Sequence, residues 1–309
     1  AGNVMGDMKE TAFEQGMLVE HKTLGLGKIV FASDKLHIFF KDLKGSYEDA
    51  TKPIALSMSD QVLTVSTSQS HPELDNLPPF TRDGKFRVPS GLRVTHAQAR
   101  ELFRRKYPGG FLDAKYLRDE RDYKIEAHEL FQSSLGNGHL EKLIELGDMI
   151  EVVKRLQSVV SKVNLLSHFE TMAIRDGLKQ KALAEEFSKA LSDFLRDADS
   201  TAFERLVEAT ESMPVEEGKT TARKWPVVTI FPFLADPKRF MFLKPIVTRQ
   251  AADRLAFDLL YETKPNWATY SNLLAMSNLL MSNLSEFGVR DYMDVQSFIW
   301  VVGDKKYSL

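Results

Sequence analysis

Near the start of the chain, GMLVEH at residues 16–21 is followed by LGLGKIV at residues 24–30. Two short apolar runs flank glycines that can adopt positive φ, a pattern typical of two strands joined by a tight bend. LHIFF at residues 36–40 and QVLTV at residues 61–65 are further runs of strand-forming residues. We therefore expect residues 12–66 to form short strands that curl into a small barrel, because a barrel hides strand edges.

The same segment resembles a known family of small domains. Its G-x-x-V-x-H-x-x-x-G-x-G run, from Gly16 to Gly27, is similar to the first hairpin of the Tudor-like or SH3-like barrels in CarD-type RNA-polymerase-interacting domains and in short helicase-tail modules. The resemblance implies a barrel that binds a protein partner, RNA polymerase or a helicase, through an exposed strand edge and a hydrophobic groove. The partner-binding residues expected on this basis are Val19, His21, Leu24, Ile38 and Phe40.

The next two parts of the chain are distinguished by composition. Residues 67–94 contain four prolines, which interrupt any helix and predict an extended linker. Residues 95–213 carry apolar residues at helical spacing, interleaved with charge. Thr95 and Gln98 match a capping box at the start of this part. It is therefore expected to be a central helical domain.

Residues 214–309 are expected to form a C-terminal α+β domain. Residues 226–231 predict a strand, because β-branched and aromatic residues follow one another there, and Asn266 and Asp291 are expected to cap helices. The whole chain is thus predicted to be an α+β multidomain protein with a small N-terminal SH3/Tudor-like β-barrel, the helical domain and this C-terminal unit. Residues 1–11 predict a tag remnant or a loose terminus.

A locally basic segment runs from Arg100 to Lys124, where eight basic side chains meet five acidic ones and aromatic residues interleave with them. Basic groups beside aromatic rings can bind phosphates and stack bases. The alternative is a solvated helix face above aromatic core residues. The candidate nucleic-acid-binding residues are Arg100, Arg104, Arg105, Lys106, Lys115, Arg118 and Arg121.

Residues 119–128 are dense in charge. Glu120 lies four residues before Lys124, and Lys124 four before His128, a spacing typical of ordinary ion pairs on a helix. A catalytic interpretation requires a second cluster that folding brings close. An enzyme is therefore kept as the first alternative, for example a metal-dependent nuclease. The carboxylates that such an enzyme would use are Asp119, Glu120 and Glu217.

Composition excludes several classes of function. The 309 residues carry 41 basic and 43 acidic side chains, and the net charge of −2 excludes a generally basic protein that coats DNA. The absence of cysteine excludes disulfides, thiolate zinc sites, iron–sulfur clusters and cysteine nucleophiles. No two of the seven histidines lie within four residues of each other, and no apolar run approaches the length of a membrane helix.

These observations favour a non-catalytic binding protein that docks to a nucleic-acid-processing machine, either RNA polymerase or a helicase. Contact with nucleic acid is part of this expectation, while a metal, a cofactor and a membrane are not. A cytoplasmic location fits the absence of cysteine. A structural subunit of a larger complex is the second alternative.

Overall fold

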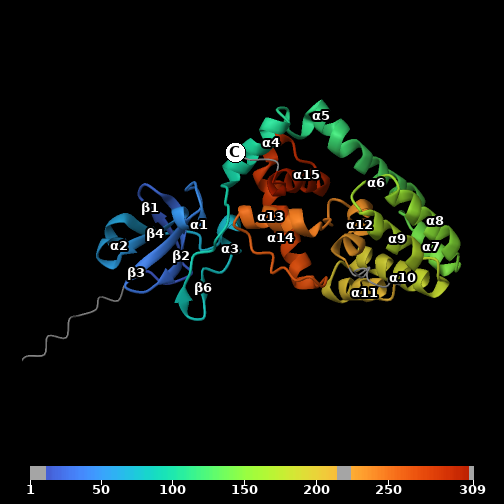
Figure 1. The fold of residues 1–309 in the computed structure, drawn as a ribbon, viewed down its shortest axis with the longest axis horizontal. Helices are drawn as coiled ribbons and strands as arrows, with labels where there is room; N and C mark the ends of the chain where they lie inside the picture. The colour runs from blue at the N-terminus through green and yellow to red at the C-terminus, as the bar shows by residue number, and fades with distance from the viewer. Residues whose placement is uncertain (1–11, 214–223, 306–309) are drawn as a thin grey trace, which may run out of the picture. The chain divides into compact units, whose positions relative to one another are not determined.

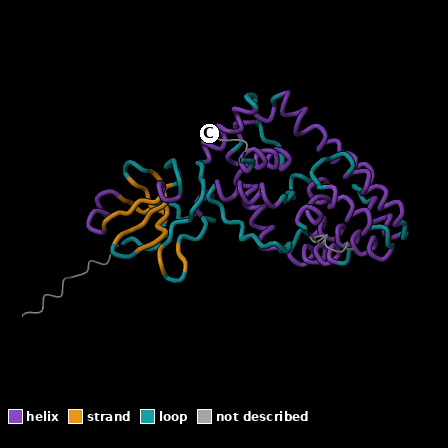
Figure 2. Tube along the Cα trace, viewed as in Figure 1, coloured by secondary structure: helices purple, strands orange, loops and turns teal. Residues whose placement is uncertain are grey.

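The computed structural model describes residues 12–213 and 224–305 and divides the chain into two compact units. Unit 1 comprises residues 1–99 together with 253–258, and unit 2 comprises the remainder. Within the described residues every strand belongs to unit 1, whereas unit 2 is built from helices and loops (Figure 2). The chain is therefore a mixed α+β protein.

Unit 1 is organised around an antiparallel five-stranded sheet in the order β4-β3-β2-β1-β5 (Figure 1). The first three strands confirm the sequence prediction, and the run at residues 61–65 is strand only in its second half. Helix α2 occupies the connection before β5. The strands are β1 Leu18–His21, β2 Gly25–Ala32, β3 Lys35–Phe40, β4 Thr51–Ala55 and β5 Leu63–Val65, and the helices beside them are α1 Tyr47–Ala50 and α2 Leu56–Val62.

The two glycines of the LGLG run serve different purposes. Gly25 has φ +81°, in the left-handed region that favours glycine. Gly27 lies so close to β3 that a Cβ there would be 2.7 Å from the side chains of Ile38 and Phe40. The first glycine therefore permits the bend and the second permits the close approach of two strands.

Both faces of the sheet are buried. One face holds Val19, Ile38 and Phe40 in an apolar cluster, and the other holds Leu18 and Phe39. The second face is covered by residues distant in sequence, namely Leu74, Phe80 and Ala256. A sheet that is covered on both sides has no free apolar face left within unit 1.

Residues 67–94 do more than link domains. They form α3 Pro72–Asp75 and a two-stranded hairpin, β6 Thr81–Arg82 and β7 Lys85–Phe86. Arg93 is buried over the ring of Phe39 and donates hydrogen bonds to backbone carbonyls at the end of β3, including that of Leu43 at 2.7 Å. The expectation of an extended linker was wrong in this respect, because residues 67–94 form a helix and a hairpin and their apolar side chains complete the core of unit 1.

From residue 96 onward the described chain is built from helices and loops, and the predicted capping box at Thr95 is present. The Thr95 hydroxyl accepts from the backbone N–H of Gln98 at 3.1 Å, and the Gln98 side chain accepts from the Thr95 N–H at 2.9 Å. Asp199 caps α11 by accepting from the backbone N–H of Ala202 at 2.8 Å. The helices are α4 His96–Lys106, α5 Ala114–Tyr116, α6 Asp122–Ser134, α7 His139–Glu145, α8 Met149–Val160, α9 His168–Gly177, α10 Lys181–Asp197, α11 Ser200–Glu211, α12 Trp225–Ala235, α13 Pro245–Arg254, α14 Trp267–Asn283 and α15 Tyr292–Gly303.

The strand predicted at residues 226–231 is wrong, because these residues lie in helix α12. Every residue of α12 is buried, so no polar face interrupts the apolar run and the helical period is hidden. Pro226 is tolerated in the first turn, where its missing N–H has no helical partner. The described part of the C-terminal region, residues 224–305, contains no strand, which corrects the predicted α+β character of that domain.

A second apolar run of this region, residues 240–243, is neither helix nor strand. Its backbone is held by side chains: the Tyr270 hydroxyl accepts from the Met241 N–H at 3.1 Å and donates to its carbonyl at 2.9 Å. The Thr229 hydroxyl accepts from the Leu243 N–H at 3.0 Å. Among the described helices of the chain, none combines the length and apolar character needed to cross a membrane.

Candidate functional site

Folding of unit 2 brings a second polar cluster to the charge-dense segment that begins at residue 119. The segment starts in a π-helical turn, Leu117–Arg121, and continues into α6. π-Helical turns are rare and are frequent at functional sites. The partner cluster comes from the first turns of α15, more than 160 residues later in the chain. Its members are Asp291, Asp294, Gln296 and Ser297.

Arg121 joins the two clusters by ion pairs. Its guanidinium donates two hydrogen bonds of 2.8 Å to the carboxylate of Asp291 and one of 3.0 Å to Asp294. Burial alone would lower the pKa of Arg121, but the two carboxylates outweigh burial and raise it. Asp291 also caps α15 by accepting from the Met293 N–H at 3.0 Å. A bidentate pair of this kind fixes the turn rigidly to the start of the helix.

Asp294 is fully buried and has several partners besides Arg121. The Tyr116 hydroxyl donates to it at 2.6 Å, and the Arg290 Nε donates at 3.1 Å. Burial and the adjacent carboxylate raise the pKa of Tyr116 well above its ordinary value. A buried carboxylate is tolerated only when its oxygens are paired in this way.

Lys124 is the second buried cation of this cluster, after Arg121, and its exposed fraction is 1%. Its ammonium donates to Gln296 Oε1 at 2.6 Å and to Ser297 Oγ at 3.0 Å, and Glu120 Oε2 lies 3.5 Å away. Burial lowers the pKa of Lys124 to about 8, an effect that the charge of Glu120 partly offsets. The sequence offered no role for Gln296 and Ser297, and the structure places both against this lysine.

A polar pocket of about 320 Å³ opens beside Lys124. Its wall is contributed by the π-helical turn, α6, α15 and the loops that precede α9 and α13. Charged and aromatic groups share this lining. The lining includes Asp119, Glu120, Lys124, Lys244, Gln296 and Trp300.

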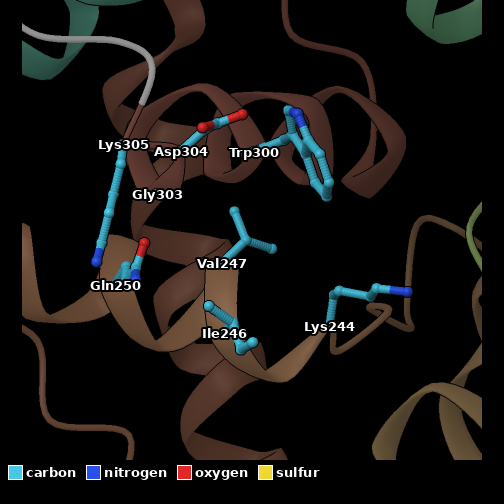
Figure 3. A pocket seen from close by; sticks show the side chains of 8 residues that line it. All are labelled: Lys244, Ile246, Val247, Gln250, Trp300, Gly303, Asp304 and Lys305. Atoms are coloured by element: carbon cyan, nitrogen blue, oxygen red, sulfur yellow. The ribbon is translucent and has the colours of Figure 1, made fainter.

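An adjoining pocket of about 450 Å³ shares Lys244 and Trp300 with the polar pocket and is mainly apolar. Figure 3 shows Trp300 of α15 facing Ile246 and Val247 of α13 across this space. Trp300 is 37% exposed and Ile246 is 74% exposed, so both present apolar surface to solvent. Gly303 allows the two helices to approach, because a Cβ there would lie 2.1 Å from the Val247 carbonyl oxygen.

The seven predicted nucleic-acid-binding residues differ in exposure and in their partners. Arg121 is buried in ion pairs and is unavailable to a ligand, which corrects its assignment. Among the exposed ones, Arg105 pairs with Glu101 at 3.7 Å and Arg118 with Asp119 at 3.4 Å. The remaining four are Arg100, which is half-buried, Arg104, which lies 4.9 Å from the Phe287 ring, Lys106, which lies 5.4 Å from the Tyr107 ring, and Lys115, which is exposed.

The predicted partner-binding residues of the barrel are mostly core. Val19, Ile38 and Phe40 are each 0% exposed, so their assignment to a partner contact is wrong. Leu24 packs partly buried on the same cluster. His21 is half-buried, and its Nδ1 accepts from the backbone N–H groups of residues 23 and 24 at 3.1 Å each. Side chains along a strand point alternately to the two faces of the sheet. The residues chosen from the resemblance are mostly those that point into the core.

Unit 1 carries a basic and aromatic surface that the sequence analysis missed. Phe86 of β7 stacks on Phe31 of β2, with ring centroids 5.1 Å apart, and lies 4.4 Å from the ring of His37 in β3. All three rings are partly exposed. We call this trio, together with the exposed basic residues at the start of β3 and in or directly after the β6–β7 hairpin, the hairpin surface. The basic members are Lys35, Arg82, Lys85 and Arg87.

A sequence signal for this hairpin exists. Asp83 and Gly84 have φ of +51° and +72°, and Asp-Gly between two short strands is a typical two-residue hairpin turn. The prolines on either side of it favoured a linker instead. None of the four basic residues forms an ion pair with any residue in 12–213 or 224–305.

The metal-dependent nuclease alternative gains no cluster from the fold. Within the described residues, no three histidine or acidic side chains lie together in a way that can hold a metal ion. Glu217, which that alternative used, lies outside the described residues. Asp119 and Glu120 are neighbours in the polar pocket, where Lys124 and Arg118 are their basic partners.

In comparisons with known proteins, the chain matches no family model, no curated protein and no solved structure. The function of each site is therefore argued from its own geometry.

Proposed function

We propose that this chain is a non-catalytic binding protein of a nucleic-acid-processing machine, and that unit 1 contacts single-stranded nucleic acid through the hairpin surface. The observation that carries this proposal is the stacked trio of Phe31, His37 and Phe86, together with four exposed basic residues at the start of β3 and in or directly after the β6–β7 hairpin that form no ion pair among the described residues. Proteins bind single strands by combining cations that follow the phosphates with rings on which bases stack.

The charges of the hairpin surface favour a polyanion. Alternation along β3 places Lys35 on the same side as His37. Lys85 and Arg87 adjoin Phe86 in the sequence, and Lys85 with its cross-strand partner Arg82 lies on the other side of the hairpin from Phe86. The nearby acids are Asp34 and Asp83, so four positive charges meet two negative ones. Burial lowers the pKa of His37, which favours the neutral ring.

The proposal includes the SH3-like or Tudor-like barrel for unit 1. The strand order supports the barrel. Strands β1 to β4 pair one after another as a meander, and β5 then pairs with β1 at the edge of the sheet. RNA polymerase or a helicase remains the proposed protein partner, on the resemblance of residues 16–27. Because Val19, Ile38 and Phe40 are core, such a partner has to use an edge strand, and Val65 of β5 is 47% exposed there.

The test is a comparison of two triple variants in the full chain. Arg82→Glu/Lys85→Glu/Arg87→Glu reverses the hairpin surface, and Arg104→Glu/Arg105→Glu/Lys106→Glu reverses the same number of charges on α4. We expect the first to weaken binding of a labelled single-stranded oligonucleotide at least tenfold and to flatten its salt dependence. We expect the second to change affinity less than threefold.

Circular dichroism and thermal unfolding establish that both variants are folded. Equal loss in both variants, or a loss confined to the α4 variant, contradicts the assignment of the interface to unit 1. Absence of binding by the unmodified chain at low salt contradicts nucleic-acid contact altogether.

A further inference from the structure

We propose that the two adjoining pockets of unit 2 form one binding site for a small zwitterion with an apolar side chain, the chemistry of an apolar α-amino acid. The inference concerns unit 2 alone and does not depend on the function proposed for unit 1. It rests on how three kinds of group are distributed over the pocket walls.

One wall offers unused carboxylate oxygens. Glu120 Oε2 faces Lys124 and Asp119 Oδ1 faces Arg118, while Glu120 Oε1 and Asp119 Oδ2 have no hydrogen-bond partner among the described residues. Both residues belong to the π-helical turn and both line the polar pocket. Ionised carboxylates accept charge-assisted hydrogen bonds from an ammonium group. This wall therefore fits the amino end of the ligand.

A different wall offers a cation. Lys244 precedes α13, donates to the Leu165 carbonyl at 2.9 Å and lies 3.6 Å from Glu170. An ammonium group has three donors, so one is left for a ligand carboxylate. Its side chain is 32% exposed and lies on the rim that both pockets share. The carboxyl end of the ligand fits here.

The apolar pocket beyond Lys244 fits the ligand's side chain. Trp300 forms part of both pockets, so an apolar chain that leaves the polar pocket passes along its indole onto Ile246 and Val247 (Figure 3). Burial of apolar surface is favourable, so this pocket favours branched or aromatic side chains over glycine. The cavity volumes are of the size used for small ligands.

Other classes of ligand fit the walls less well. A phosphate would face the carboxylates of Asp119 and Glu120, and a polyamine would face Lys244 with its second ammonium group. Lys124 is buried and saturated by Glu120, Gln296 and Ser297, so it serves as a positioning residue that holds Glu120 at the wall. Carboxylates from the π-helical turn and a cation from the loop before α13 line the same pocket, and this combination selects a zwitterion.

The test is isothermal titration of the full chain with leucine and two analogues that each lack one end. The first, 3-methylbutylamine, lacks the carboxylate, and the second, 4-methylpentanoic acid, lacks the amine. Leucine should bind at least tenfold more tightly than either analogue and than glycine. Equal affinity for all four, or no binding of leucine at millimolar concentration, overturns the proposal.

Variants then assign each end of the ligand to its wall. Glu120→Gln should weaken leucine and the amine at least fivefold and leave the acid unchanged, whereas Lys244→Met should weaken leucine and the acid and leave the amine unchanged. Glu129→Gln and Lys238→Met, both exposed and outside the pockets, are the matched controls. Equal effects of both substitutions on both analogues, or effects of the controls of the same size, overturn the assignment.

Discussion

The hairpin surface of unit 1 and the charged cluster of unit 2 use the same residue types in opposite ways. Arg82, Lys85 and Arg87 are exposed and form no ion pair among the described residues, whereas Arg121 and Lys124 are buried and fully partnered. Exposed charge is free to meet a ligand, and buried charge holds elements together. Only tertiary structure separates these two roles, since both segments read as basic and aromatic in the sequence.

The largest difference between the two regions is expected in the free energy of unfolding when one arginine is removed from each. Arg121→Met leaves Asp291 and Asp294 buried without their shared partner, and we expect it to lower the free energy of unfolding by about 3–5 kcal/mol. Arg82→Met should change it by less than about 0.5 kcal/mol, because that side chain is exposed. Chemical denaturation at pH 7 measures both. Similar losses in the two variants would mean that the cluster is not a structural ion-pair network.

The next effect is a pH dependence due to Lys124. Its folded pKa of about 8 lies below its ordinary value of 10.5, so below pH 8 the amine is charged in both states and burial costs stability. From pH 8 to 10.5 only the unfolded state keeps the proton, and the unmodified chain should gain up to about 3 kcal/mol relative to Lys124→Met. Denaturation at pH 7 and pH 10 measures the difference.

Lys115→Met is the control for this pH dependence, because Lys115 is exposed. The unmodified chain and Lys115→Met should respond to pH in parallel. If Lys124→Met runs parallel to them as well, the buried lysine does not titrate as described.

A smaller effect compares a packed glycine with an open one. Gly303→Ala places a Cβ 2.1 Å from the Val247 carbonyl oxygen and should cost about 2 kcal/mol, because α13 and α15 have to move apart. Gly84→Ala meets no atom within 4 Å, and its cost of about 1 kcal/mol comes from φ +72° alone. Thermal unfolding ranks the two. A larger loss for Gly84→Ala would contradict the close packing beside the apolar pocket.

Local signals predicted much of the fold. The strands of residues 18–40, the capping box at Thr95 and the caps at Asn266 and Asp291 each depend on neighbouring residues, and all are present. Helix α12 was not predictable in this way, because complete burial removes the polar side from the pattern. The alternation of polar and apolar residues shows which side of a helix or strand faces solvent. It cannot identify an element such as α12, in which no side faces solvent.

The candidate sites depended on contacts that local patterns do not contain. Glu120 and Lys124 were recognised as an i,i+4 pair, but their partners Gln296 and Ser297 come from the other end of unit 2. Likewise the hairpin surface exists only because Phe86 folds back onto Phe31. Residues so far apart in the sequence give no periodic signal. The sequence therefore identified the individual residues but could not predict that they are in contact.

The contrast between exposed charge in unit 1 and buried charge in unit 2 is tested most directly by lysine acetylation of the full chain. Mass spectrometry would measure the labelling of each lysine with and without a single-stranded oligonucleotide. Without it, Lys85 and Lys115 should react readily and Lys124 should be protected by burial. The oligonucleotide should protect Lys35 and Lys85 and leave Lys115 reactive. Protection of Lys115 while Lys85 stays reactive, or fast labelling of Lys124, would contradict the contrast between the two units.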